Sequence, residues 1–257
     1  MKHDLVVIGA GSAGLTAGIF AAEAGLDTAL VEQSPDDISG ECLRSGCVPS
    51  KTLLRIAQNI HDADNLTDIG LRVRGKPDWD AVKDEIQSVQ ETIREAESPS
   101  SLRERDITTY FGTAAFTGRR SLQVDDTTVS ADTIILATGT APRTPSVQGI
   151  DKADTVTNET IFEMDELPDE LLVVGGGPLG CELGQALNRL GSDVTIVERG
   201  SYLLGTEPVE ASKRVRKSFE DEGINVFCDT DVTGFDEHTA YVTTANGERS
   251  LSFDNVL

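Results

Sequence analysis

The segment LVVIGAGSAG, residues 5–14, recurs as LLVVGGGPLG at residues 171–180. In both copies four hydrophobic residues precede glycines spaced as G-x-G-x-x-G. An acidic residue lies at the same distance beyond each copy, Glu32 after the first and Glu198 after the second. A strand, a glycine-rich turn, a helix and a second strand that ends in a carboxylate form the βαβ unit that binds dinucleotides. The repeat therefore predicts two such units in one chain.

The glycines and the carboxylate of each copy have separate expected tasks. The first glycine allows a tight turn, the second lets the backbone approach a pyrophosphate, and the third lets the helix pack on the strand. The helix N-terminus offers N–H groups to the phosphates, and the carboxylate accepts a hydrogen bond from a ribose hydroxyl. The candidate cofactor-binding residues are Gly9, Gly11, Gly14 and Glu32 in the first copy and Gly175, Gly177, Gly180 and Glu198 in the second.

Two dinucleotide sites in one chain imply electron transfer between two dinucleotides, for which a flavin and a nicotinamide are the economical pair. The alternative is an α/β domain whose glycine-rich turns hold no ligand. Glu198 favours NAD over NADP, because a carboxylate repels the additional 2′-phosphate of NADP.

A further motif, GECLRSGCVPSK, spans residues 40–51. On a regular helix, residues five apart point roughly 140° away from each other. A disulfide between Cys42 and Cys47 therefore requires an irregular turn, which Gly46 can supply. A thiol at a helix N-terminus has a stabilised thiolate, as a redox-active cysteine requires. Inert buried thiols and zinc binding are the alternatives, although zinc needs four ligands and only His61 lies nearby in the sequence.

Charge limits the classes of partner. The 257 residues include 44 Asp and Glu against 22 Lys and Arg, which gives a formal net charge of −22. This charge repels phosphate backbones and anionic membranes, so neither nucleic acid nor a membrane is an expected partner. No segment approaches the roughly 20 apolar residues of a membrane span, and the N-terminus lacks a signal-peptide pattern, so we expect a cytoplasmic protein. The acidity is either incidental or halophilic, an adaptation to molar salt, which we favour.

Between the two copies, apolar residues at helical spacing predict helices over about residues 49–66 and 78–97, which pack against each other. Short alternating runs between Ile107 and Ala137 predict a small antiparallel β-meander. A linker rich in proline and glycine then places the domain boundary near residue 148. The predicted fold is α/β, with two Rossmann-like dinucleotide-binding domains at residues 1–148 and 149–257 and the meander in the first.

Taken in order, these motifs resemble those of the class I flavin-dependent pyridine nucleotide–disulfide oxidoreductases, and the resemblance covers the whole chain. The family includes dihydrolipoamide dehydrogenase, glutathione reductase and mercuric reductase. The resemblance rests on both glycine motifs, the Cys-x4-Cys-Val-Pro-Ser-Lys run at residues 42–51, and Ala137-Thr138-Gly139. Within the family, the sequence is most similar to the dihydrolipoamide dehydrogenase and mercuric reductase branch.

The resemblance implies that the first domain binds FAD, with contacts from Thr138 and Gly139, and that the second binds NAD(P)H. It implies a relay that passes two electrons from NAD(P)H through FAD to a redox-active disulfide. That disulfide exchanges electrons with a small or protein-bound disulfide or dithiol such as lipoamide, or with Hg(II). No resident metal site is expected. The catalytic residues implied by resemblance are Cys47 against the flavin, Cys42 toward substrate, and the pair of Lys51 and Glu182 near the flavin.

Departures from the family pattern lead to further expectations. Ser39 and Glu41 stand where Gly and Thr are more usual. Family members continue into a returning segment of the FAD domain, a final strand of the NAD(P) domain and a dimerisation domain, and we expect all three to be absent here. The resemblance thus implies a homodimer for the full-length family only. The alternative function is a catalytically inactive nucleotide-binding fragment.

Overall fold

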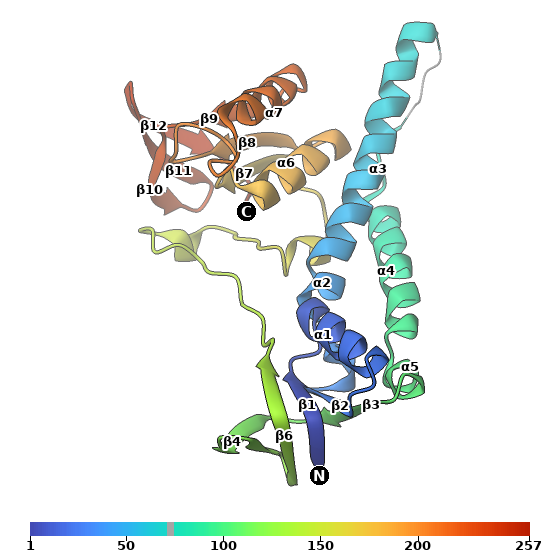
Figure 1. The fold of residues 1–257 in the computed structure, drawn as a ribbon. Coiled ribbons are helices and arrows are strands. Elements are labelled where there is room, and N and C mark those ends of the chain that lie inside the picture. Colours follow the sequence, from blue (N-terminus) through green and yellow to red (C-terminus); the bar gives the residue numbers. More distant parts are fainter. Residues whose placement is uncertain (71–74) are drawn as a thin grey trace. The chain divides into compact units, whose positions relative to one another are not determined.

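The computed structural model describes residues 1–70 and 75–257. The described residues form two compact units, the first built on one sheet and the second on two (Figure 1). The first contains residues 1–49 and 87–141, and the second contains residues 50–86 and 142–257. Residues 50–86 belong to the second unit although they precede the expected domain boundary near residue 148. The extents of the two domains and their ligands stay predictions.

The first unit is built on one six-stranded sheet in the order β3-β2-β1-β6-β5-β4. α1 (Ser12–Glu23) connects the central strand β1 (Lys2–Ile8) to β2 (Thr28–Glu32), as the first sequence copy predicts. Two further strands extend the parallel part of the sheet, β3 (Ile107–Phe111) beside β2 and β6 (Thr127–Leu136) beside β1. Strands inside a parallel sheet are covered on both faces, which explains the unbroken hydrophobic runs of β1 and β2.

The predicted meander is confirmed over its last three strands. β4 (Ala114–Gly118), β5 (Ser121–Val124) and β6 pair antiparallel in chain order. The prediction is wrong for β3, which we assigned to the meander but which pairs parallel with β2 at the opposite edge. Alternating hydrophobicity gives the faces of a strand but does not identify its partner, which here lies far back in the sequence.

The second copy of the repeat folds like the first. β7 (Glu170–Val174) leads through α6 (Pro178–Leu190) to β8 (Asp193–Val197). This parallel sheet has the order β13-β7-β8-β9. The predicted α/β fold class is confirmed, with a parallel sheet here and a mixed sheet in the first unit. The remaining elements of this layer are α7 (Val209–Asp221), β9 (Asn225–Phe227) and β13 (Asn255–Val256).

An antiparallel sheet between β9 and β13 was not predicted. It contains β10 (Asp231–Asp236), β11 (Thr239–Thr244) and β12 (Gly247–Ser252). Most residues of β12 are exposed, so the strand lacks the hydrophobic alternation that would have indicated it.

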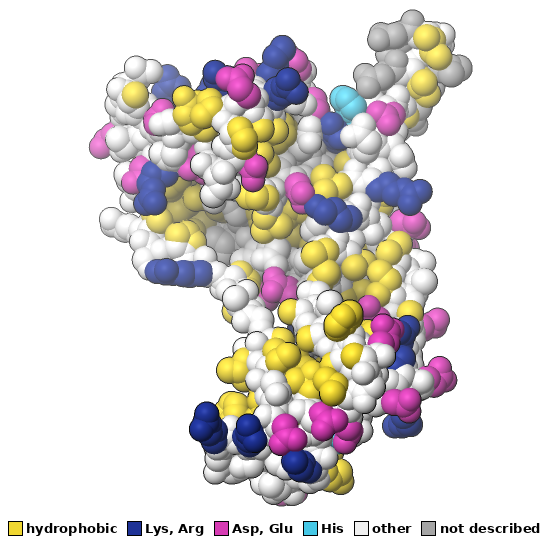
Figure 2. Space-filling model, viewed as in Figure 1, with side chains coloured by type: hydrophobic (Ala, Val, Ile, Leu, Met, Phe, Trp, Pro, Cys, Tyr) yellow, Lys and Arg dark blue, Asp and Glu magenta, His cyan; other side chains and the backbone are white. Residues whose placement is uncertain are grey.

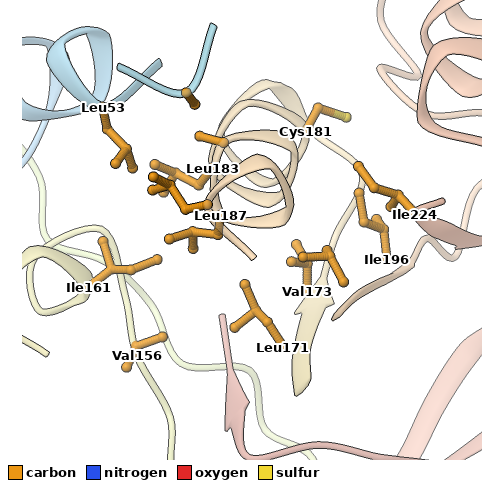
Figure 3. Close-up of a cluster of buried hydrophobic side chains, with 14 of the residues drawn as sticks. Leu53, Val156, Ile161, Leu171, Val173, Cys181, Leu183, Leu187, Ile196 and Ile224 are labelled. Atoms are coloured by element: carbon orange, nitrogen blue, oxygen red, sulfur yellow. The ribbon is translucent and has the colours of Figure 1, made fainter. Parts of the chain in front are cut away.

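Both helices predicted between the repeats are confirmed, as α3 (Cys47–Asn65) and α4 (Trp79–Ala96). In the second unit their apolar side chains pack together with α6 and with β7 and β8. Figure 3 shows Leu53 of α3 facing Leu183 and Leu187 of α6 in this core. The shorter helices are α2 (Gly40–Arg44) and α5 (Pro99–Glu104), with single 3-10 turns at Pro35–Asp37, Leu66–Ile69, Ile150–Lys152 and Ile161–Glu163.

None of the helices within residues 1–70 and 75–257 combines the length and the apolarity needed to cross a bilayer. The same residues contain no cluster of three or more histidine, cysteine or acidic side chains arranged to hold a metal ion.

A mostly buried ion pair joins α6 to the end of α7. The Arg189 guanidinium donates to both carboxylate oxygens of Glu222, with Nε–Oε2 at 2.7 Å and Nη2–Oε1 at 2.9 Å. Gln185 and Ser218 also donate to Oε1. Burial raises the pKa of Glu222, but these hydrogen bonds and the positive charge of Arg189 outweigh it and hold the pKa below its usual value.

Replacing Glu222 by glutamine is expected to lower the free energy of unfolding by about 3 kcal/mol, because it leaves the Arg189 charge buried without a counter-ion. Since the folded-state pKa is lowered, the carboxylate stabilises the fold fully above its unfolded pKa and loses this effect as the pH falls through the folded value. Urea unfolding at neutral and acid pH measures both effects. Glu220→Gln is the control, because Glu220 pairs with Arg216 at the exposed surface. An equal loss in both variants would contradict the prediction.

Candidate functional site

The first glycine turn links β1 to α1. Gly9 has φ +102°, and a Cβ there would lie 2.1 Å from the carbonyl oxygen of Ala137. A Cβ at Gly14 would lie 1.8 Å from the carbonyl oxygen of Gly9. Both positions therefore exclude any side chain because the backbone is already packed there. We expected the third glycine, Gly14, to let the helix pack on the strand. It does allow close packing, but its nearest neighbour is Gly9 in the turn.

Gly11 differs from these two glycines because its surroundings are open. A Cβ there would meet only the Cα of Gly40, at 3.7 Å. Gly11 is the N-cap residue of α1 and, because it has no side chain, leaves this helix end without a side-chain cap. An open helix N-terminus with exposed N–H groups suits an anion such as a pyrophosphate.

Glu32 stands at the end of β2, where the sequence predicted a ribose ligand. Its carboxylate accepts hydrogen bonds from the backbone N–H of Ala10 and of Gln33, both at 2.7 Å. The carboxylate is thereby fixed beside the glycine turn. Glu32 also lines a cavity of about 350 Å³, together with Gly9, Gly11, Thr138 and Gly139.

The second glycine turn repeats this geometry. Gly175 has φ +122°, and a Cβ at Gly180 would lie 2.2 Å from the carbonyl oxygen of Gly175. A Cβ at Gly177 would have no neighbour within 4 Å. Glu198 accepts hydrogen bonds from the N–H of Gly176 at 2.7 Å and of Gly200 at 2.5 Å. Each predicted glycine and carboxylate thus occupies the same place in both units.

A second cavity, of about 330 Å³, adjoins this turn. It is bounded by Gly175, Gly177 and Gly180, by Arg143, and by apolar side chains that include Val174 and Phe235.

The cysteine segment contains the irregular turn that the spacing requires. The chain leaves α2 after Arg44 and enters α3 at Cys47, so the two cysteines belong to different helices. The N–H groups of Ser45 and Gly46 both donate to the carbonyl oxygen of Glu41, at 2.9 and 2.7 Å. A Cβ at Gly46 would lie 3.1 Å from the Cα of Cys42, so a larger residue would strain this turn.

Cys42 and Cys47 are free thiols in contact with each other. Burial and the hydrogen bond with Cys47 raise the pKa of the Cys42 thiol, and the negative charge of Glu97 acts in the same direction. The backbone N–H of Cys47 acts in the opposite direction but does not prevail. Cys42 is half-buried, whereas Cys47 is exposed.

The glycine turn and the cysteine segment are joined within the first unit. Ser39 donates its N–H to the carbonyl oxygen of Ala10 at 2.8 Å, and Ser39 and Gly11 form a parallel β-bridge. Ser39 has φ 72°, the left-handed region that favours glycine. The serine that departs from the family pattern therefore occupies a position better suited to the usual glycine.

Lys51 and Glu182 pair within the second unit. The Lys51 ammonium lies 2.7 and 2.6 Å from the two carboxylate oxygens. The side chains are 61% and 39% exposed, so the pair is partly exposed to solvent. Exposed ion pairs contribute about 0–1 kcal/mol, so this pair adds little to folding stability.

The other two cysteines belong to the second unit. Cys181 is buried in the core of the second unit, where burial raises its pKa to about 11, and its thiol contacts the carbonyl oxygen of Gly176 at 3.4 Å. Burial also raises the pKa of Cys228.

The family model described as pyridine nucleotide-disulphide oxidoreductase matches residues 3–257. The chain belongs to this family. Its members use FAD and a nicotinamide nucleotide.

Relatives with the same sequence identity to this chain carry two different names. Mercuric reductase from Lysinibacillus sphaericus is 32% identical over 226 residues, which cover 88% of this chain and 41% of that protein. Dihydrolipoyl dehydrogenase from Chlamydia pneumoniae is 32% identical over 261 residues, which cover 100% of this chain and 56% of that protein. The chain therefore spans about half the length of the curated relatives it matches.

Among solved structures, a Cu(II) complex of the HOCl-induced flavoprotein disulfide reductase RclA from Escherichia coli is similar. It has a TM-score of 0.79 and 26% identity, over 98% of this chain and 55% of that one. Membership of the pyridine nucleotide-disulphide oxidoreductase family thus agrees with the resemblance in the motifs.

Sequence reasoning missed one part of the first cavity. Thr113 and Ala114, which follow β3, line it beside the glycine turn. The carboxyl ends of parallel strands meet at one edge of a sheet, where ligands bind. Placing β3 in the parallel sheet would have indicated these residues.

Proposed function

We propose that this chain carries the FAD, nicotinamide and dithiol sites of a disulfide oxidoreductase. The observation that carries the proposal is the contact between the Cys42 and Cys47 thiols in the unit that also holds the open first glycine turn. The second glycine turn, with its own carboxylate, supports a second dinucleotide site.

In this proposal the first unit binds FAD. Gly11 leaves room for the pyrophosphate at the N-terminus of α1, and the fixed Glu32 carboxylate accepts from the ribose. Thr138 and Gly139 bound the same cavity and would contact the cofactor. When bound, FAD supplies two-electron chemistry that connects a nicotinamide to thiols. Cys47 would face it, and the ion pair of Lys51 and Glu182 would supply balanced charge nearby.

Cys42 is the thiol proposed to exchange with substrate. Its thiolate attacks one sulfur of an external disulfide and displaces the other sulfur as a thiolate. The Cys47 thiolate then attacks the sulfur of Cys42, which forms the Cys42–Cys47 disulfide and releases the second product thiol. Two electrons pass from the dithiol to the substrate. Oxidation of a dithiol such as dihydrolipoamide reverses these steps, and Hg(II) is an alternative acceptor that the relatives' names suggest.

An anaerobic NADH titration of the purified chain in high salt, with added FAD, tests the function. We expect a yellow protein whose flavin absorption bleaches and which gains a long-wavelength thiolate-to-flavin band. Bleaching without that band would contradict the role of Cys47 and leave the nucleotide sites standing. A chain that stays colourless with FAD would contradict the proposal in favour of an inactive fragment. High salt is chosen because we propose that the acidic surface is halophilic.

Glu198 is proposed to set the preference for NADH. Replacing it by glutamine removes the charge that opposes a 2′-phosphate and keeps one acceptor oxygen for the N–H of Gly176 or Gly200. The ratio of NADH to NADPH affinities is expected to fall roughly tenfold, which corresponds to about 1.4 kcal/mol. Fluorescence titration with both nucleotides measures it. Glu32→Gln is the matched control at the equivalent place of the first copy, and a similar fall there would contradict the assignment.

A further inference from the structure

A groove of about 550 Å³ opens beside Cys42 in the first unit. It lies between α1, the start of the cysteine segment and the last turns of α4. Apolar side chains make up most of its wall, namely Leu15, Ile19, Phe20, Leu43, Val48 and Ile93. Phe20 is 75% exposed, so a large aromatic face is available to a ligand. Figure 2 shows hydrophobic side chains gathered over α1, with acidic ones beside them.

The charged side chains among the described residues of this groove are all negative. Apart from Cys42, its ionisable side chains among the described lining residues are the carboxylates of Glu23 and Glu97. Glu97 accepts a hydrogen bond from the neutral hydroxyl of Ser39, so this partner leaves its negative charge in place. Glu23 lies 3.6 Å from Arg105 across an exposed surface, which weakens its effect. Glu97 is therefore the main source of negative potential in the groove.

The same carboxylate acts directly on the thiol. The negative charge of Glu97 adds to the raised pKa of Cys42, so the two groups interact electrostatically. A ligand whose sulfur reaches Cys42 must place its adjoining groups on the apolar wall and near Glu97. An anionic group there would be repelled without a cation to compensate it.

We propose that this groove admits disulfides with an apolar body and no negative charge, and excludes anionic disulfides from Cys42. This inference rests on the proposed role of Cys42 as the exchanging thiol and adds the substrate class. The groove should admit a disulfide that carries a neutral amide or a cationic amine, and it should exclude one that carries a carboxylate or a sulfonate.

The test measures the rate at which Cys42 reacts with three methanethiosulfonates, a neutral methyl, a cationic trimethylammonium-ethyl and an anionic sulfonatoethyl reagent. The Cys42 thiolate attacks the alkylthio sulfur of each reagent, a mixed disulfide forms, and the bond to the sulfonyl group breaks with release of methanesulfinate. The reduced Cys47→Ser chain is used, because Cys47 would otherwise displace the adduct from Cys42, and mass mapping of peptides reports the modification of Cys42 alone. The ionic strength is the lowest at which the chain stays folded. We expect the cation to react at least tenfold faster than the anion.

Glu97→Gln should lower the ratio of cation to anion rates about threefold, because one charge is removed near the reacting sulfur. Glutamine retains an acceptor for Ser39. The variant also changes the pKa of Cys42, but this affects all three reagents alike and cancels in the ratio. The matched control is Glu91→Gln, which removes a charge from an exposed part of α4 outside the groove and should leave the ratio unchanged.

Equal rates for anion and cation in the Cys47→Ser chain with Glu97 intact would overturn the proposal. So would an unchanged ratio in Glu97→Gln, or an equal change in Glu91→Gln, which would assign the preference to the net charge of the whole chain. Because the measurement uses neither FAD nor NADH, its failure is distinguishable from a failure of the proposed relay in the NADH titration.

Discussion

Replacing Cys42 by serine is expected to slow the second step of the exchange at least a thousandfold. In that step one cysteine displaces the product thiol from the other, and in the variant the displacing thiol must come from a second molecule. In the unaltered chain the two thiols touch, and an intramolecular attack has an effective concentration far above that of free thiols in solution. A serine hydroxyl does not ionise at neutral pH and cannot take part in the exchange.

The stoichiometry of the products makes this prediction sharp. After reaction with a small neutral disulfide, the unaltered chain should lose two hydrogens and carry no adduct, as measured by intact mass. Cys42→Ser should instead retain a mixed disulfide on the exposed Cys47. Cys228→Ser is the control and should behave like the unaltered chain. A Cys42→Ser protein that still forms an internal disulfide would contradict the proposed pair.

The pH dependence of this exchange follows from the raised pKa of Cys42. The thiolate is the nucleophile, so a raised pKa leaves less of it at neutral pH and the rate should rise as the pH increases through that value. Removing the charge of Glu97 should shift the rise toward lower pH.

The second large effect separates two glycines of one turn. Gly180→Ala is expected to destabilise the second unit by about 3 kcal/mol or more, since its Cβ would lie 2.2 Å from the carbonyl oxygen of Gly175. Gly177→Ala should leave thermal stability unchanged, because its φ of −74° suits alanine and its Cβ would have no neighbour within 4 Å. It should nevertheless weaken NADH binding at least tenfold, because the methyl group occupies the space left for the pyrophosphate.

Thermal unfolding and NADH titration of the two variants measure this difference. If Gly177→Ala bound NADH as tightly as the unaltered chain, the nucleotide would not lie against this turn. If it lost stability like Gly180→Ala, the open space beside Gly177 would not exist.

The repeat and the cysteine spacing predicted much of the structure because both are local patterns. Hydrophobic runs before the glycines correctly placed β1 and β7, and the five-residue spacing correctly required a break in the helix before Cys47. The pairing of strands that lie far apart in the sequence was harder to infer. The partner of β3 is a strand about eighty residues earlier, and nothing in its own alternation indicates it.

Burial of polar pairs also depends on tertiary contacts that the sequence does not encode locally. The family motif suggested the pairing of Lys51 with Glu182, yet not that both side chains would be partly exposed. The groove beside Cys42 combines residues from α1 and α4, whose proximity no single stretch of sequence reveals.

Gly11 and Gly40 face each other across the bridge between the cofactor turn and the cysteine segment. A Cβ on Gly40 would lie 2.7 Å from the Cα of Gly11, whereas one on Gly11 would approach Gly40 no closer than 3.7 Å. The two positions therefore do not tolerate change equally. A combinatorial library that aims to abolish cofactor binding without disturbing the fold can diversify position 11, where a side chain would fill the space left for the pyrophosphate, while position 40 is kept as glycine. If both positions were randomised, most variants would carry a side chain at position 40 that displaces the cysteine segment from the glycine turn.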